Sequence, residues 1–418
     1  MRSDIKNVQG WARSKVKYEL KNLDHRRIPI SSEQRGKMSD RKYDYYGASG
    51  VIDKVEDYLF DEPLILIGED GENLRSRSTS LAFLATGKYW VNNHAHILKP
   101  INGDINFMMY KLNSINYVPY ITGSAQPKLT RKNLDNIELL IPSLNEQILI
   151  STFLNRKVTE IDDLIADKEK LIKLLEEKRQ AVITEAVTKG LDRNVKMKDS
   201  GVEWIGEIPE HWEEKRIKYL FSEVNDRNFN EKAELLSLFT SIGVRPRKDM
   251  EQKGNKSQTV INYKIVRKGD IVVNKLLAWM GSIGISIYDG VTSPDYDVYR
   301  PLNKDLVSKD YFHYYFRNFH FKGDCYKFGR GIMLMRWRTY SEDFKKILVT
   351  LPPIEEQNRI ADYLDKISNE IEYLIDNNLT IINKLKEYRQ SLIYEAVTGK
   401  IDVREMVGQT EQEEVSSS

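Results

Sequence analysis

Two stretches of this chain carry basic and amide side chains among aromatic and turn residues, within residues 1–142 and within residues 200–352. Arginine and lysine suit phosphate groups, and arginine, lysine, asparagine and glutamine can also hydrogen-bond to base edges. These residue types predict contact with DNA, although a solvated surface position is the competing interpretation for any single one. The candidate DNA-binding residues are Arg26, Arg27, Arg41, Arg75, Arg77, Asn92, Asn93, Gln126 and Lys128, then Arg245, Arg247, Asn274, Lys275, Arg330, Arg336 and Arg338.

The net charge is unevenly distributed along the chain. The formal charge of the whole protein is only +2 at pH 7. Residues 1–142 carry about +4 and residues 200–352 about +5, whereas residues 143–199 sum to about zero and residues 353–418 to about −7. Positive charge therefore lies in the two stretches that hold the candidates, as a polyanion-binding surface requires. These excesses are modest, so chance scatter stays open as an alternative.

Signatures of catalysis are missing from the sequence. It has no GxxxxGK(S/T) phosphate loop, no GxGxxG opening a helix, no GxSxG elbow, and no NPPY or DPPY tetrapeptide of the adenine methyltransferase type. His94 and His96 would share one face of a strand, but no cysteine or carboxylate cluster completes a metal site around them. We predict a protein that is not an enzyme by itself and has no catalytic residues, metal or cofactor.

The candidate residues must be positioned by mixed α/β domains. Short β-like runs bounded by turn residues occur in both stretches, for example at residues 64–67, 96–98 and 268–273, and a helix is predicted at residues 309–319. The single cysteine, Cys325, precludes a disulfide framework and favours a reducing compartment. The N-terminus lacks the apolar core of a signal peptide, and no run spans a bilayer comfortably, so we expect a cytoplasmic protein without a membrane partner.

The remaining parts of the chain repeat each other. Residues 141–192 return as residues 351–402 without a gap, with roughly 20 of about 52 positions identical. IPSLNEQ matches LPPIEEQ near the start, and an EAVT block is found near the end of both copies. The period is too long for a solenoid. The order is therefore variable, repeated, variable, repeated, which suits two different binding domains presented in one common way.

Both repeats predict long helices. Apolar residues alternate at spacings of four and three over more than four heptads, within residues 154–186 and 364–396, which favours a coiled-coil seam. Ser143 and Glu146 fit a capping box at the start of the first helix. Parallel and antiparallel pairing both fit this pattern.

The repeats also duplicate polar surface positions that a hydrophobic seam does not require. One explanation is that both helices offer the same surface to two copies of one partner, and the other is recent duplication. The candidate partner-binding residues are Glu146, Gln147, Glu177, Arg179 and Gln180, with their counterparts Glu356, Gln357, Glu387, Arg389 and Gln390.

This arrangement resembles the specificity subunit of type I restriction–modification systems over nearly the whole chain. The resemblance rests on the two Pro-x-x-x-Glu-Gln helix starts, the two EAVT blocks, and the segment EWIGEIPEHW at residues 203–212. At the N-terminus only Gly10 and Trp11 match that segment, so the start of the first domain is less sharply defined. The segment SPDY also looks similar and adds Ser293 and Tyr296 to the candidate DNA-binding residues.

The resemblance implies an α+β protein with two mixed α/β target recognition domains, separated by two long helices that form an antiparallel coiled coil. The implied parts are recognition domains at residues 1–142 and 200–352, helical spacers at 143–199 and 353–403, and an acidic, disordered tail at 404–418. Each recognition domain would read one half of a bipartite, asymmetric site in double-stranded DNA. The helices would set the spacer and dock two methylation subunits, which two restriction subunits can join.

The same resemblance implies that S-adenosylmethionine, ATP and Mg²⁺ belong to the partner subunits, in a bacterial or archaeal cytoplasm. The alternative function is a coiled-coil scaffold that pairs two copies of a partner enzyme without reading DNA. The uneven charge distribution favours DNA binding over this scaffold.

Overall fold

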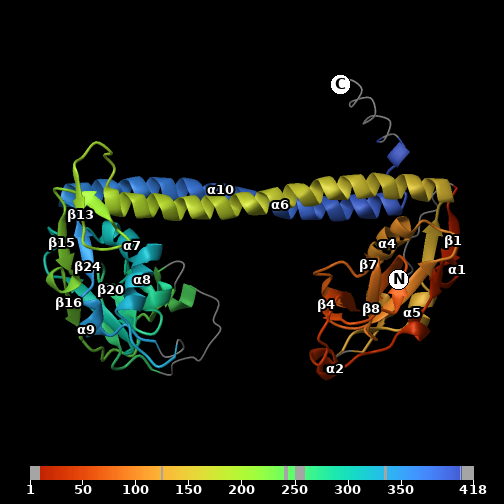
Figure 1. The fold of residues 1–418 in the computed structure, drawn as a ribbon, viewed down its shortest axis with the longest axis horizontal. Coiled ribbons are helices and arrows are strands. Elements are labelled where there is room, and N and C mark those ends of the chain that lie inside the picture. The colour runs from red at the N-terminus through yellow and green to blue at the C-terminus, as the bar shows by residue number, and fades with distance from the viewer. Residues whose placement is uncertain are drawn as a thin grey trace, which may run out of the picture. The chain divides into compact units, whose positions relative to one another are not determined.

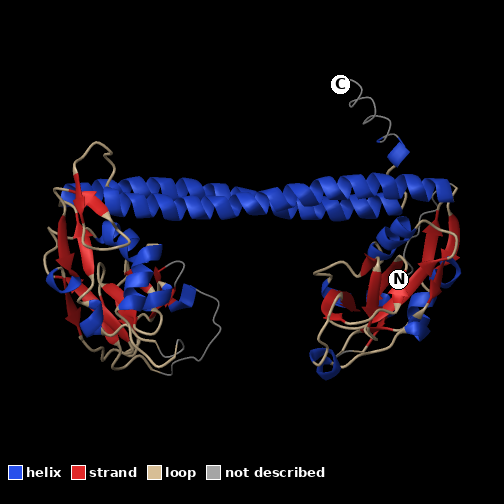
Figure 2. Ribbon diagram, in the orientation of Figure 1, coloured by secondary structure: helices blue, strands red, loops and turns tan. Residues whose placement is uncertain are grey.

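The computed structural model describes residues 10–123, 126–239, 243–249, 259–333, 337–404 and 406. Contacts divide the chain into two compact units, Met1–Lys168 with Thr380–Ser418, and Glu169–Leu379. Each unit contains one α/β domain and part of each of two long helices (Figures 1 and 2). None of the helices in the described residues is long and apolar enough to cross a membrane.

The first α/β domain is built from short strands and shorter helices. Its strands are β1 (Ala12–Lys15), β2 (Leu20–Asn22), β3 (Tyr43–Gly47), β4 (Gly50–Val55), β5 (Phe60–Asp61), β6 (Leu64–Gly68), β7 (Ala82–Ala85), β8 (Lys88–Val91), β9 (Ala95–Pro100), β10 (Ile121–Thr122), β11 (Lys128–Leu129) and β12 (Glu138–Ile141). Its helices are α1 (Val16–Glu19), α2 (Ser32–Gly36), α3 (Asn73–Ser76), α4 (Ile105–Asn113) and α5 (Arg131–Asp135), with 3-10 turns η1 (Asp24–Arg26) and η2 (Val118–Tyr120).

Strand pairing brings distant parts of this domain together. One antiparallel sheet has the order β2-β9-β6-β7, and a second has the order β4-β3-β8-β5, in which β3 and β8 run parallel. β1 pairs with β12, which joins the first and last strands of the domain. The apolar strand predicted at residues 64–67 is β6. It lies inside the first sheet, paired with β7 on one side and β9 on the other.

The second α/β domain has the same kinds of elements. Its strands are β13 (Met197–Asp199), β14 (Glu207–Pro209), β15 (Glu213–Arg216), β16 (Phe221–Val224), β17 (Leu236–Phe239), β18 (Gly243–Pro246), β19 (Lys264–Val266), β20 (Ile271–Asn274), β21 (Ile283–Ile285), β22 (Gly290–Thr292), β23 (Tyr296–Pro301) and β24 (Leu348–Leu351). Its helices are α7 (Lys309–Arg317), α8 (Phe319–Lys327) and α9 (Ser341–Phe344), with 3-10 turns η3 (Ile217–Tyr219), η4 (Arg247–Asp249) and η5 (Ala278–Met280).

The two domains share a central topology. The sheet order β16-β23-β20-β21 repeats the order β2-β9-β6-β7, and the pair β15–β24 repeats the pair β1–β12. Trp11 and Trp212, each directly before the first strand of these pairs, are both buried. Two stretches with little identity can share a fold because pairing and burial constrain the pattern of side chains more than their identity.

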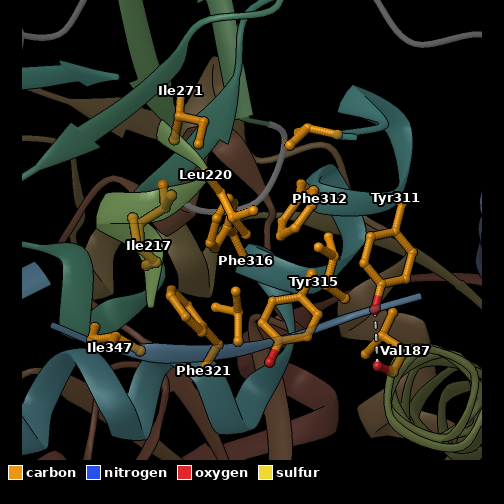
Figure 3. Close-up of a cluster of buried hydrophobic side chains, with 14 of the residues drawn as sticks. Val187, Ile217, Leu220, Ile271, Tyr311, Phe312, Tyr315, Phe316, Phe321 and Ile347 are labelled. Atoms are coloured by element: carbon orange, nitrogen blue, oxygen red, sulfur yellow. Dashed lines mark hydrogen bonds between the residues drawn. The ribbon is translucent and has the colours of Figure 1, made fainter. Parts of the chain in front are cut away.

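Aromatic side chains form the core of the second domain. Tyr311, Phe312, Tyr315 and Phe316 of α7 pack together with Phe321 of α8 (Figure 3). The ring centroids of Phe316 and Phe321 lie 5.0 Å apart, and those of Phe312 and Phe316 lie 5.3 Å apart. Aromatic pairs at such distances stabilise a core beyond the area they bury. The core therefore holds α7 and α8 firmly against the sheet.

The helix predicted at residues 309–319 is α7, and a second helix, α8, begins directly after it. α7 ends at Arg317, and Asn318 is the N-cap of α8, where its side chain accepts a hydrogen bond from the His320 amide at 2.7 Å. Asparagine is favoured at such a position because its side-chain oxygen satisfies an amide that the helix leaves unpaired. The predicted helix is therefore confirmed over Lys309–Arg317, and only its last two residues lie beyond the break.

The repeated segments form two long helices, α6 (Leu144–Lys189) and α10 (Ile354–Val397). Gly190 directly follows the end of α6 with φ 73°, and Gly399 lies two residues beyond α10 with φ 70°. These left-handed conformations suit glycine and end the helices. The predicted long helices are confirmed, and glycine marks the end of both.

Within each unit the two helices run antiparallel. In the first unit Asp162 of α6 forms an ion pair with Arg389 of α10 at 3.0 Å, so the start of α6 lies beside the end of α10. In the second unit Val187, near the end of α6, shares a buried cluster with Ile360 and Leu364, near the start of α10. The structure thus decides an orientation that the heptad pattern left open.

Candidate nucleic-acid interface

A buried glutamine joins each α/β domain to the helix that follows it. The side-chain oxygen of Gln147 accepts a hydrogen bond from the Asp104 amide at 3.0 Å, and that of Gln357 accepts one from the Ser308 amide at 2.8 Å. Asp104 and Ser308 are the N-cap residues of α4 and α7. Each glutamine also donates to the carbonyl of the proline five positions earlier, at 3.0 and 2.8 Å. The two domains are therefore attached by the same set of contacts.

These contacts correct the prediction that Gln147 and Gln357 bind a partner subunit. The two residues are only 4% and 0% exposed, and their amide groups are hydrogen-bonded inside the chain. Leaving a buried polar group unpaired costs about 1–3 kcal/mol, so these side chains cannot turn outward cheaply. The repeated glutamine stabilises the junction between domain and helix.

The neighbouring glutamates lie at the same junctions but stay partly exposed. Glu146 accepts a hydrogen bond from the Trp11 indole at 3.1 Å, and Glu356 lies 2.8 Å from Nε2 of His211.

The capping box predicted at Ser143 and Glu146 is half formed. The Ser143 hydroxyl accepts from the Glu146 amide at 3.4 Å, while the Glu146 carboxylate turns to Trp11 instead.

Side chains of the domains also bind the ends of the long helices. In the first unit Lys111 donates a hydrogen bond to the Val397 carbonyl at 2.7 Å. In the second unit the Val187 carbonyl accepts from the Tyr311 hydroxyl at 3.1 Å and from Thr350 at 3.3 Å (Figure 3). The last carbonyls of a helix have no partner within it, so these donors satisfy them. Both valines belong to the EAVT blocks, and each is buried together with the alanine before it.

The other predicted partner-binding residues lie on the surfaces of the helices. Arg389 is half-buried and paired with Asp162, and Arg179 is also half-buried. These positions stay predictions, and the side chains most accessible to a partner are Glu177, Gln180, Glu387 and Gln390.

Arg27 belongs to a network of charged groups inside the first domain. Its guanidinium lies 2.7 Å from Glu69 and 3.6 Å from Asp24. It also donates to the carbonyls of Asn93 and Ala95, at 3.3 and 2.8 Å. Only 16% of the side chain is exposed. The prediction that Arg27 contacts DNA is therefore corrected, because its donors are occupied by groups of its own domain.

His96 is the buried member of the same network. Its Nδ1 lies 2.6 Å from Asp24, and its Nε2 lies 2.8 Å from the Leu129 carbonyl. Burial alone would lower the pKa of His96, but the hydrogen bond and charge of Asp24, with further help from Leu129 and Glu69, raise it above its ordinary value. Burial acts to raise the pKa values of Asp24 and Glu69, but His96 lowers that of Asp24, and Arg27, with His96 and Lys128, lowers that of Glu69.

Arg77 and Asn92 stabilise turns of the first domain, Arg77 as a half-buried and Asn92 as a buried residue. Arg77 follows α3 with a left-handed φ of 51°, and its guanidinium donates to the carbonyls of Asn113 and Ile115. Asn92 is only 4% exposed, and its side-chain oxygen accepts from the His94 amide at 2.8 Å. The prediction that these two residues bind DNA is corrected, because their polar atoms form hydrogen bonds with backbone groups of their own domain.

Six candidates of the first domain remain accessible. Arg26, Arg41 and Lys128 form ion pairs with carboxylates of their own domain at 3.0, 3.2 and 3.2 Å, with side chains about half exposed. The partners of Arg26 and Arg41 are themselves partly exposed, and such pairs contribute only about 0–1 kcal/mol, so a phosphate can replace those two carboxylates. The other accessible candidates are Arg75, which donates to the Gly123 carbonyl at 2.9 Å, and the exposed Asn93 and Gln126.

In the second domain Lys275 lies directly after β20, above a buried carboxylate. Asp297 of β23 is 3.4 Å from the Lys275 ammonium and 3.1 Å from that of Lys264. The Lys275 side chain is 27% exposed, so its ammonium can be reached from solvent. Asn274 is only 7% exposed, and its side-chain oxygen accepts from the Leu276 amide at 3.1 Å. The prediction for Asn274 is therefore corrected, since this side chain shapes the turn that presents Lys275.

Arg330 and Arg338 face each other across a backbone bridge close to Lys275. Each amide donates to the carbonyl of the other, at 2.9 and 3.0 Å. Trp337 stacks on Tyr326 with ring centroids 4.9 Å apart. The amide of the residue after Arg338 donates to the Lys275 carbonyl at 3.0 Å. The structure thus brings Lys275 together with two candidates that lie more than fifty residues later in the sequence.

Four further candidates of the second domain are half-buried, as are Lys275 and Arg338. Tyr296 stands opposite the last residue of β20 in the sheet register, and burial raises the pKa of its hydroxyl. Arg336 lies outside the described residues. The half-buried candidates are Arg245, Arg247, Ser293 and Tyr296.

The sequence prediction missed Asp24, Glu69 and Asp297, the buried carboxylates beneath these surfaces. A single charged residue among apolar neighbours, as in YDVY at β23, was the available signal.

His94 and His96 do not share a site, because His94 lies 2.8 Å from Asp70 whereas His96 lies 2.6 Å from Asp24. Within the described part of the chain, no group of three or more histidine, cysteine, aspartate or glutamate residues could hold a metal ion.

The chain has two domains of one topology. Each domain is attached to one helix start and one helix end, and each carries its own cationic residues. This arrangement is that of a DNA-recognition protein with two reading domains. The family model for the type I restriction modification DNA specificity domain matches residues 10–174 and again residues 209–386. The chain therefore belongs to the family of type I restriction–modification DNA specificity subunits, which recognise DNA in a sequence-specific way.

Curated relatives and solved structures agree with this assignment. A Haemophilus influenzae protein, provisionally named type I restriction enzyme specificity subunit S.HindORF215P, is 25% identical over 394 residues, covering 90% of this chain and 93% of the relative. The EcoDI specificity subunit of Escherichia coli is 21% identical over 388 residues, covering 87% and 83%.

Two solved structures show the same fold. A chain from a structural study of complex assembly and conformational transition in a type I R-M system has a TM-score of 0.67 at 14% identity, covering 95% of this chain and 100% of that chain. The HsdS subunit from Thermoanaerobacter tengcongensis has a TM-score of 0.53 at 15% identity, covering 96% and 99%.

Proposed function

We propose that each α/β domain reads one half of a bipartite, asymmetric DNA site, and that the paired helices set the spacer between the halves. The observation that carries this proposal is the common topology of two domains with different side chains at their surfaces. Identical domains would suit a symmetric site, whereas two dissimilar ones suit a sequence whose halves differ. The first domain offers Gln126 and Lys128, and the second offers Lys275, Arg330 and Arg338.

We further propose that the exposed faces of α6 and α10 dock two methylation subunits. Leu174 of α6 and Tyr388 of α10 are 51% and 56% exposed, close to the predicted contacts Glu177 and Glu387. Large apolar side chains among polar ones are typical of protein interfaces. The partner subunits would bind S-adenosylmethionine and carry out catalysis in the cytoplasm. Two restriction subunits that use ATP and Mg²⁺ would complete the assembly.

DNA binding by the complex of this chain with its methylation partner tests the reading role. The methylated motif is the sequence around methylated adenines in cells that express this chain with its partner. The dissociation constant for a duplex carrying this motif should rise steeply with salt, because phosphate contacts release counterions. An affinity that is independent of salt would refute DNA reading and favour the scaffold function. Incubation of the chain alone with DNA and labelled methyl donor should transfer no methyl group.

The Arg338→Ala variant tests whether the two domains read separately. Arg338 has a half-buried side chain beside Lys275, so its loss should relax discrimination at one half-site by about tenfold, within the usual cost of a mismatched base pair. Arg404→Ala is the matched control, because that arginine lies beyond α10, outside both α/β domains. Equal relaxation at both half-sites would contradict the two-domain mechanism.

A further inference from the structure

The two domains place opposite buried charges at the same position of matching strands. His96 is the second residue of β9, and Asp297 is the second residue of β23. These strands occupy the same place in the common sheet order. Both residues are almost fully buried, at 1% and 3% exposure. A charged side chain at such a position is costly unless it is paired, so its contacts indicate what it does.

His96 fixes the segment that presents Gln126 and Lys128. Its Nε2 binds the Leu129 carbonyl at 2.8 Å. The same segment is held by the Leu129 amide, which donates to the Glu69 carbonyl at 2.7 Å, and by the Lys128 ammonium, 3.2 Å from the Glu69 carboxylate. Two of these three contacts are made by side chains of the buried network, His96 and Glu69.

The contacts of His96 require a positively charged ring. A carbonyl oxygen only accepts hydrogen bonds, so Nε2 must carry a hydrogen to bind Leu129. Nδ1 lies 2.6 Å from the Asp24 carboxylate, which is also an acceptor. Both ring nitrogens then donate, which only the imidazolium can do. Loss of one proton would remove a hydrogen bond either from Asp24 or from the segment at Leu129.

Asp297 has the corresponding role in the second domain. Its Oδ1 lies 3.1 Å from the Lys264 ammonium and 3.4 Å from that of Lys275. Its Oδ2 is buried without a hydrogen-bond partner among the described residues. The anion thus holds Lys275 beside the bridge formed by Arg330 and Arg338. Replacing the carboxylate by a neutral group would remove the charge that directs this lysine.

We propose that His96 and Asp297 are positioning residues for DNA recognition, His96 for the segment of Gln126 and Lys128 and Asp297 for Lys275. The inference rests on the proposed function, since it assigns roles within the same two reading domains. Neither side chain touches DNA in this mechanism. Each instead determines where the accessible side chains of one domain lie.

The test uses His96→Gln and Asp297→Asn in the complex with the methylation partner. Binding is measured by fluorescence anisotropy on the methylated motif and on duplexes with single base-pair changes in either half-site. The half-site of the second domain is the one relaxed by Arg338→Ala. The matched controls are His25→Gln and Asp305→Asn, which replace exposed residues of the two domains.

His96→Gln should reduce discrimination about tenfold at the first domain's half-site and leave the other unchanged, and Asp297→Asn should do the converse. The controls should match the wild type at both half-sites. Equal losses at both half-sites, or unchanged discrimination in both variants, would overturn the inference. Absence of discrimination by the wild-type complex at either half-site would instead refute the proposed function.

A pH series on the wild-type complex separates positioning from folding. Discrimination at the first domain's half-site should fall as pH rises through the raised pKa of His96, while discrimination at the other half-site stays level. The charged groups facing His96 are Asp24, Glu69, Arg27 and, through Glu69, Lys128. The lowered pKa values of the two carboxylates keep both ionised across this range. Parallel pH profiles at the two half-sites would refute the role of His96.

Discussion

Replacing Gln357 with leucine should destabilise the second unit strongly while leaving the helix surface unchanged. Gln357 is fully buried, and its amide group contacts the Ser308 amide and the carbonyls of Pro352 and Leu306 at 2.8, 2.8 and 3.0 Å. Leucine fills a similar volume, so the main loss is hydrogen bonding. Each buried group left unpaired costs about 1–3 kcal/mol, so three groups give a loss of roughly 3 kcal/mol at the least.

Hydrogen exchange followed by mass spectrometry measures this loss in each unit separately. A loss of about 3 kcal/mol accelerates exchange through opening of the unit about 150-fold. Amides of α7 and β24 should show that acceleration, and amides of the first domain should not. Gln180→Leu is the control, because Gln180 is exposed on α6 in the same unit and such surface changes stay within about 0.5 kcal/mol. If both variants accelerate exchange equally, Gln357 does not stabilise the junction.

Three further predictions concern the helices and their attachment. Burial lowers the pKa of Lys111 to about 8. Between pH 8 and about 10 the Lys111 amine is therefore protonated in the unfolded chain but largely neutral in the folded one. The free energy of unfolding of the first unit should rise over that range by about 3 kcal/mol more than in Lys111→Met, as measured by denaturant titration; parallel curves would contradict this. Arg389→Ala should cost less than about 1 kcal/mol in the same titration, because the ion pair with Asp162 is partly exposed. Adding one heptad to both helices, about 10.5 Å of helix, should lengthen the spacer of the methylated motif by about three base pairs; sequencing of methylated adenines in cells would show an unchanged spacer if the helices do not set it.

Periodicity predicted the long helices correctly because a coiled coil requires apolar residues at alternating spacings of three and four, a pattern visible in the sequence alone. The apolar spacing in residues 154–186 and 364–396 needs no knowledge of distant contacts. Antiparallel pairing was undetermined at that stage, since a heptad pattern reads the same for both orientations. It is decided by contacts such as Asp162 with Arg389, which join residues more than 200 positions apart.

The polar positions were harder to predict, because residue type does not reveal burial. Arg27, Arg77 and Asn274 have the chemistry of DNA contacts, yet their polar atoms satisfy groups of their own domains. The repeat predicts that Gln147 and Gln357 bind a partner, because the same residue occurs at the same place in both copies. Their repetition instead reflects two equivalent junctions, which become visible only when the N-caps of α4 and α7 lie beside them.

The repeat, the apolar spacing and the residue types were enough to predict two variable domains, two long helices and side chains suited to DNA. These features depend on local pattern and on repetition within the chain. Which of those residues remain accessible, and which buried charges hold them, depends on contacts between distant parts of the chain. His96 and Asp297 acquire their roles from partners up to 72 positions away, because a buried charge is stable only where the fold supplies its counter-charge.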